Sequence, residues 1–136
     1  MDYRTVPSVC IYCGCGCGML LEVLDGMPVG LLAEKGHPVN DGRLCIKGWN
    51  ALEHATHAER LTSPLIKGKD GSFRKASWDE ALDLVAGRLS EIRKESGPDS
   101  LAVLTSAKCT NEENYVLMKF ARAVLGTNNV DHCARL

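Results

Sequence analysis

The sequence predicts an α+β fold in which a small module built around antiparallel hairpins is followed by the first part of an α/β domain. The first observation is a loop rich in cysteine and glycine, at residues 10–18, set among short apolar runs and turns. The second is an amphipathic helix, an apolar strand and another helix that follow a change of character near Arg60. We therefore predict two domains, residues 1–60 and 61–136.

Composition excludes several classes of protein. The chain has 136 residues, 45% of them apolar, and a net charge of −1. We expect no nucleic-acid partner, since there is no basic stripe, and no apolar run is long enough to span a membrane. The first residues lack a signal-peptide pattern, so the expected compartment is the cytoplasm. There, the seven cysteines are expected to be metal ligands or free thiols rather than disulfides.

The cysteine loop is the strongest chemical signal. Its thiols, with one distant partner, are Cys10, Cys13, Cys15, Cys17 and Cys45. Thiolates are soft ligands that favour iron–sulfur clusters, zinc or copper(I), and this spacing lets three sulfurs reach one centre from a single loop. Cys45 supplies the fourth ligand. By reach alone, either Cys15 or Cys17 can be the third.

Two other kinds of cysteine site remain as alternatives. A zinc ribbon usually carries a second Cys-x2-Cys pair, whereas here the distant ligand is the lone Cys45. A thioredoxin-like site needs a helix directly after its cysteines, and Gly14, Gly16 and Gly18 oppose one. The glycines instead allow positive φ and close approach to an inorganic core, whose sulfurs their amides can bind. The spacing favours an iron–sulfur cluster, with a zinc-stabilised structural module as the alternative.

The rest of the first part reads as short strands, a loop and a helix. Asp25-Gly26 is typical of a tight turn between two apolar runs, which predicts a hairpin that brings the chain back towards the cysteines. The expected elements are a strand at 5–9, hairpin strands at 19–24 and 28–33, a loop at 34–42 and a helix at 49–58.

The second part begins with a hairpin, residues 64–67 and 73–76, and a capping box, Ser77 to Glu80, that opens a helix ending before Gly97. Its apolar stripe consists of Trp78, Ala81, Leu82, Val85, Leu89 and Ile92.

A second capping box opens the last helix. The box runs from Thr110 to Glu113, and the helix is expected to reach about Leu125, with Gly126 at its end. Residues 101–105 before it form an apolar strand typical of parallel sheets buried on both faces. No other segment looks suited to pair with that strand, so we expect the remaining strands of this domain to be missing from the chain.

The remaining candidate ligands are better explained by ordinary structural roles. His54 and His57 lie one helical turn apart, but no third ligand is in view, so we expect surface or capping roles. The isolated candidates are Cys109, Cys133, His37 and His132. Isolated cysteines are most often small core residues.

The cysteine pattern, completed by Cys45-Ile46-Lys47-Gly48, resembles the amino-terminal [4Fe-4S] module of molybdopterin-dependent oxidoreductases. The segments 110–115 and 119–131 are similar to the catalytic subunit of formate dehydrogenases of the H type. The resemblance implies that Cys10, Cys13, Cys17 and Cys45 bind the cluster and that Cys15 is not a ligand. It also implies that Lys47 lies between cluster and pterin and helps to relay electrons.

The resemblance further implies a function for the complete protein. Formate is oxidised to carbon dioxide at molybdenum or tungsten held by bis-molybdopterin guanine dinucleotide, and two electrons leave through the pterin and the cluster. The second part of the chain is then the start of a pterin-binding domain. Implied partners are the remainder of the catalytic subunit and iron–sulfur or hydrogenase-type subunits. Nitrate reductase and formylmethanofuran dehydrogenase relatives fit the segment 119–131 less well.

In the formate dehydrogenase H pattern, the residue after the position of Leu136 is the selenocysteine or cysteine that binds the metal. We therefore expect no catalytic residue within the chain and no formate oxidation by the chain alone. A selenocysteine codon, UGA, read as a stop is one hypothesis for this end. A stand-alone electron-transfer subunit that docks on a separate catalytic chain is the other possibility considered.

Overall fold

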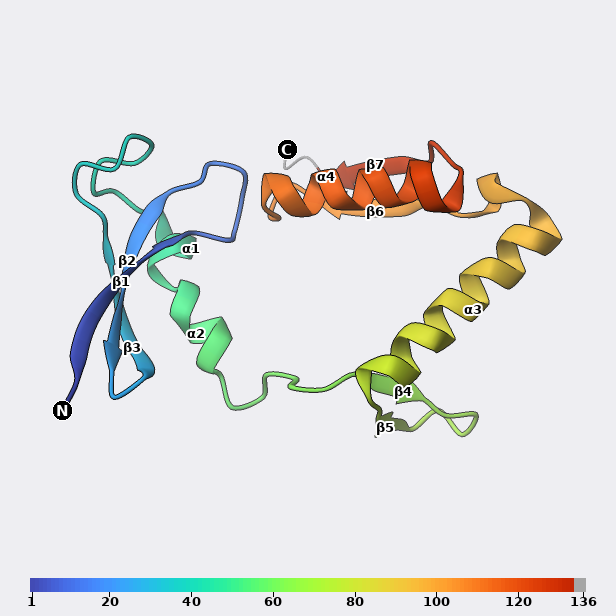
Figure 1. The fold of residues 1–136 in the computed structure, drawn as a ribbon, viewed down its shortest axis with the longest axis horizontal. Coiled ribbons are helices and arrows are strands. Elements are labelled where there is room, and N and C mark those ends of the chain that lie inside the picture. Colours follow the sequence, from blue (N-terminus) through green and yellow to red (C-terminus); the bar gives the residue numbers. More distant parts are fainter. Residues whose placement is uncertain (134–136) are drawn as a thin grey trace. The chain divides into compact units, whose positions relative to one another are not determined.

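The computed structural model describes residues 1–133 and contains two compact units (Figure 1). The first unit comprises Met1–Arg60, Thr105–Tyr115 and the residues from His132. The second comprises Leu61–Leu104 and Val116–Asp131. Each unit is described by itself below.

A three-stranded antiparallel sheet forms the larger part of the first unit. Its strands are β1 (Tyr3–Val9), β2 (Gly18–Leu24) and β3 (Met27–Ala33), in that order across the sheet. The predicted hairpin is confirmed, with Asp25 at φ 48° and Gly26 at φ 83° in its turn. β1 adds a third strand, and its last residue, Val9, lies opposite Gly18. The two ends of the cysteine loop are thereby held side by side.

Two short helices follow the loop after β3. They are α1 (Ile46–Trp49) and α2 (Ala51–Thr56), so the prediction of one helix at 49–58 was wrong in its extent. Asn50 leaves helical geometry, at φ −102° and ψ 16°, while its side chain donates a 2.7 Å hydrogen bond to the Ile46 carbonyl. Cys10, Met19 and Ala51 form the small buried core beneath the cysteine loop.

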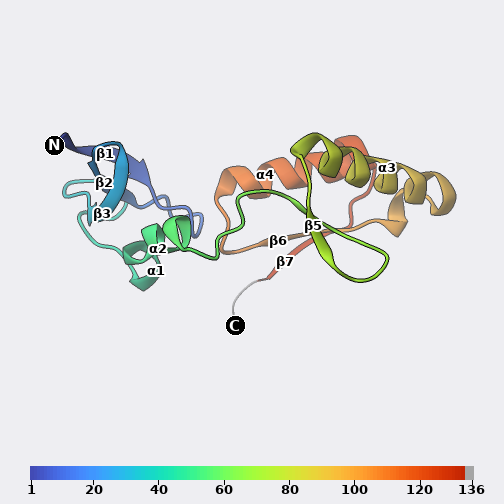
Figure 2. The ribbon, with the colours of Figure 1, turned by 90° about the horizontal axis from the view of Figure 1, so that it is seen from below.

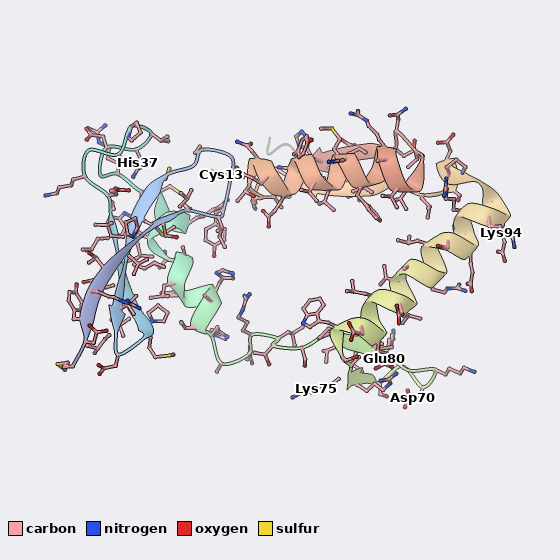
Figure 3. All side chains as sticks on the ribbon, in the orientation of Figure 1. Cys13, His37, Asp70, Lys75, Glu80 and Lys94 are labelled. Carbon is pink, nitrogen blue, oxygen red and sulfur yellow. The ribbon has the colours of Figure 1, made fainter. Side chains whose placement is uncertain are left out.

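The second unit contains a hairpin and a long helix. Strands β4 (Leu65–Lys67) and β5 (Phe73–Lys75) pair antiparallel, and α3 (Trp78–Ser96) follows, so both predicted elements are confirmed. The Ser77 hydroxyl caps α3 by accepting the Glu80 N–H at 3.1 Å. The other half of the predicted capping box was wrong, because the Glu80 carboxylate binds the Arg74 guanidinium instead. Figure 3 shows Glu80 near Lys75, at the junction of β5 and α3.

This ion pair gives the second unit a pH dependence. Arg74 holds the pKa of the Glu80 carboxyl below its usual value, so the carboxylate stabilises the start of α3 above the unfolded pKa. That stability is lost as the pH falls through the lower, folded pKa. We expect the amides in the first turn of α3 to be less protected, relative to their intrinsic exchange rates, at acidic pH, and Glu80→Gln to show the lower protection already at neutral pH. Hydrogen exchange followed from pH 7 to 3 tests this prediction, which equal profiles for the two proteins would contradict.

A strand, a helix and a second strand complete the described chain. These are β6 (Val103–Ser106), α4 (Asn111–Phe120), continued by a π-helical turn at Ala121–Leu125, and β7 (Val130–Cys133). Figure 2 shows β6 and β7 side by side. The Val103 N–H donates to the Asn129 carbonyl, and the Ala107 N–H donates to the Cys133 carbonyl. Because the donor and the acceptor residue both increase in number from one bond to the next, the two strands are parallel.

This pairing corrects the expectation that β6 has no neighbour within the chain. The segment Val-Asp-His-Cys of β7 is short and mostly polar, and it therefore lacks the apolar run that marks a parallel strand. The second capping box is confirmed: the Thr110 N–H donates to Glu113 at 2.7 Å and the Glu113 N–H to the Thr110 hydroxyl at 3.2 Å. Gly126 ends the helix in the left-handed region, as expected.

Large apolar side chains remain uncovered. Trp78 on α3 is 67% exposed and Leu104 on β6 is 78% exposed, although an apolar helix stripe and an apolar strand both favour burial against neighbouring elements. The chain has 10119 Å² of accessible surface, whereas two compact domains of half its mass would together expose about 8400 Å².

Among the described residues, no helix is both long and apolar enough to cross a membrane.

Candidate metal centre

The cysteine loop connects β1 to β2, and Figure 3 labels Cys13 on it. At its base the Cys10 N–H donates to the Cys17 carbonyl at 2.9 Å, which continues the β1–β2 ladder. Cys10 is buried, at 6% exposure, while Cys13 and Cys17 are half-buried. The loop therefore presents three thiols of the predicted set on a closed backbone ring.

One glycine of the loop has the predicted positive φ, and another makes a close contact with α4. Gly16 has a φ of 70°, which turns the backbone between Cys15 and Cys17. Gly14 is needed for close approach, because the Asn111 amide donates a 3.0 Å hydrogen bond to its carbonyl. A Cβ at Gly14 would lie 3.0 Å from the Asn111 Cγ, so a side chain there would push this contact apart. The start of α4 is thus attached directly to the cysteine loop.

Cys45 lies at the N-terminal end of α1. Backbone N–H groups of Gly48 and Lys47 and the positive charge of Lys47 lower the pKa of the Cys45 thiol. The thiolate is the form that binds a metal, so this environment favours a ligand.

The cysteines lie within electrostatic range of one another. Burial is the main cause that raises the pKa of the Cys17 thiol. The negative charges that Cys10, Cys13 and Cys45 carry when ionised raise it further. A hydrogen bond with Cys13 is the main cause that raises the pKa of the exposed Cys15. The structure therefore brings the predicted ligands into one neighbourhood and places Cys15 beside them.

The donor set and its spacing fit a cluster. Within residues 1–133, no three Cys, His, Asp or Glu side chains are gathered tightly enough to hold one metal ion. A [4Fe-4S] cluster binds each cysteine through a different iron, so its ligands stand further apart than those of a single tetrahedral zinc. Four cysteine thiols, from a glycine-rich loop and a helix start, are the soft donors that such a cluster takes.

A cavity of about 410 Å³ adjoins this site. It is lined by Tyr12, Ile46, Lys47, Asn50 and Lys108. Lys47 therefore lines open space two residues after Cys45. Lys108 was not predicted, since a single lysine in the loop before α4 has no distinguishing pattern in the sequence.

His54 and His57 both have local partners. His54 Nδ1 lies 3.0 Å from the Ala51 carbonyl, and its ring packs 5.8 Å from that of Tyr12. His57 accepts the Glu59 N–H at 3.2 Å, so the capping and surface roles are confirmed for both.

Cys133 is exposed, which corrects its expected place in the core. The Ser106 hydroxyl, 3.3 Å from the sulfur, is the main cause that lowers the pKa of Cys133. Cys109 is half-buried and His132 lies in β7. The position expected to bind molybdenum or tungsten, after Leu136, lies outside the described residues.

Comparison with known families agrees with this site. Residues 3–57 match the molybdopterin oxidoreductase Fe4S4 domain, and residues 60–136 match the molybdopterin oxidoreductase domain. The chain therefore belongs to the molybdopterin oxidoreductase family.

Individual proteins similar to this chain are more specific than the family as a whole. The chain is 53% identical over 135 residues to the F420-dependent formate dehydrogenase 2 subunit alpha of Methanococcus maripaludis, covering 99% of this chain and 19% of that protein. It is 46% identical over 136 residues to the F420-dependent formate dehydrogenase subunit alpha of Methanocaldococcus jannaschii, covering 100% and 19%.

Among solved structures, acetylene hydratase from Pelobacter acetylenicus matches with a TM-score of 0.71 and 28% identity, over 93% of this chain and 18% of that one. The chain thus spans about one fifth of the length of the relatives it matches.

Proposed function

We propose that this chain is the N-terminal part of the catalytic subunit of a molybdenum- or tungsten-dependent formate dehydrogenase and that it transfers electrons through a [4Fe-4S] cluster. The observation that carries the proposal is that three cysteines lie on one glycine-rich loop closed by the Cys10–Cys17 hydrogen bond, while Cys45, at the start of α1, is near enough to affect the pKa of Cys17. The two formate dehydrogenase relatives support formate as the substrate of the whole protein.

The proposed ligands are Cys10, Cys13, Cys17 and Cys45, with Cys15 left as a free thiol. When bound, the cluster accepts and donates single electrons. The chain's own contribution is to hold four thiolates, to bury Cys10 and to keep the Lys47 side chain at the wall of the adjoining cavity. We propose that Lys47 lies on the electron path between cluster and pterin, where its positive charge also favours the Cys45 thiolate.

We further propose the domain division 1–60 and 61–136 for the complete protein, with the second part beginning the pterin-binding domain. The remainder of the subunit is the first partner, because the apolar faces of α3 and β6 need cover. It would also supply the metal ligand and most of the cofactor pocket, so the chain alone should not oxidise formate. Iron–sulfur or hydrogenase-type subunits are the proposed electron partners. We propose the cytoplasm as the compartment, since all seven cysteines are free of disulfides.

Anaerobic reconstitution of the 136-residue chain with iron and sulfide tests the cluster. We expect about four iron and four sulfide per chain, a brown colour and an EPR signal after reduction. Binding of one zinc by a colourless chain that takes up no iron would contradict the proposal and establish the zinc-stabilised alternative.

A further inference from the structure

The Asn40 side chain uses its carbonyl oxygen and both amide hydrogens on two backbone segments that lead to cysteines. Its Oδ1 accepts the Gly18 N–H at 2.7 Å, and its Nδ2 donates to the Gly18 carbonyl at 3.0 Å. The second Nδ2 hydrogen donates to the Arg43 carbonyl at 2.9 Å. One acceptor and two donors in this arrangement are available only from a side-chain amide.

These contacts connect the cysteine loop to the segment of Cys45. Gly18 directly follows Cys17, whose carbonyl accepts the Cys10 N–H. Arg43 lies two residues before Cys45. Hydrogen bonds and short stretches of backbone therefore connect Cys10 to Cys17, Cys17 to Asn40, and Asn40 to the segment before Cys45.

Local backbone geometry makes the contact possible. Gly18 is buried, and an added Cβ there would overlap the ring of His37, in the loop that carries Asn40. After Asn40, Asp41 and Gly42 adopt left-handed φ values of 42° and 75°, and the Arg43 N–H returns to the Asn40 carbonyl at 2.8 Å. Asn40 thus begins the tight turn that directs the chain to Cys45. The two bonds to Gly18 are partly shielded from water, which makes their loss more costly.

We propose that Asn40 is a positioning residue that fixes Cys45 relative to Cys10 and Cys17 and thereby sets the stability and the reduction potential of the cluster. The inference rests on the proposed function, because it assigns these cysteines to one cluster. Asn40 binds backbone on both sides, so its effect on the cluster acts through the neighbouring Cys17 and Cys45.

The test compares Asn40→Ala with Asn128→Ala in the reconstituted 136-residue chain. Asn128 is the matched control, since its Oδ1 accepts a 3.2 Å hydrogen bond from Arg122 in the second unit. For Asn40→Ala we expect about tenfold faster loss of iron to a chelator, a changed EPR spectrum and a shifted midpoint potential. Asn128→Ala should match the wild type in all three. Wild-type values for Asn40→Ala would overturn the inference.

A second variant keeps the test decisive if Asn40→Ala does not fold, as judged by circular dichroism of the chain without metal. Asn40→Asp retains the size and the acceptor for Gly18 but loses both donors, so we expect the same directions of change. Unaltered iron loss and potential in Asn40→Asp would overturn the inference. If the wild type binds only zinc, the proposed function fails, while the ratio of zinc release rates between variant and wild type still tests the positioning role.

Discussion

Substitution of Cys13 by serine is expected to remove the cluster, whereas the same substitution at Cys15 is expected to leave it. Cys13 lies in the loop closed by the Cys10–Cys17 hydrogen bond and interacts electrostatically with Cys17. A serine oxygen is a much harder ligand than a thiolate and is rarely ionised, so Cys13→Ser should retain little iron or visible absorbance after anaerobic desalting.

Cys15→Ser is the matched control, since it removes a thiol from the same loop without changing the proposed ligand set. Cys15 is exposed, and its pKa is raised mainly by a hydrogen bond with Cys13, so the free chain holds it as a thiol. Iron content, sulfide content and EPR of the three proteins measure the result. The reverse pattern, with iron retained by Cys13→Ser and lost by Cys15→Ser, would make Cys15 the ligand.

Replacement of Gly18 by alanine is expected to destabilise the first unit by about 1–3 kcal/mol, the usual cost of overpacking. The added Cβ would overlap the imidazole ring of His37 and lie 2.6 Å from the Glu34 carboxylate. Movement of the ring would break the 3.3 Å hydrogen bond that its Nδ1 accepts from the Val39 N–H, which adds to the cost. Movement of this loop would also displace Asn40, so the variant should lose iron faster than the wild type.

Gly87→Ala is the control of opposite sign. Gly87 lies exposed within α3, and no atom outside its own helix lies within 4 Å of an added Cβ. Alanine there should stabilise α3 by about 0.5–1 kcal/mol through its higher helix propensity. Hydrogen exchange of β2 amides for the first variant and α3 amides for the second separates the two effects. Equal protection of β2 in wild type and Gly18→Ala would contradict the predicted overlap.

Local patterns in the sequence were sufficient for much of the fold. The Asp25-Gly26 turn, the Ser77 and Thr110 caps and Gly97 and Gly126 depend on neighbouring residues only, and the structure confirms each of them. The spacing of the cysteines and the family resemblance together predicted which cysteines bind the cluster. The structure places those thiols near one another, but their assignment as ligands is still a prediction.

Tertiary structure decided what depends on distant partners. The Glu80 carboxylate has two possible partners, its own helix start and Arg74, and only the position of β5 determines that it binds Arg74. β7 has no apolar run, and its pairing with β6 follows from the path of α4 between them. The contacts from Asn40 to Gly18 and from Asn111 to Gly14 join residues that are far apart in the sequence. No periodic pattern of neighbouring residues predicts such contacts. The cysteine pattern by itself indicated a cluster, whereas the side chains that hold its loop in place emerged only from the folded chain.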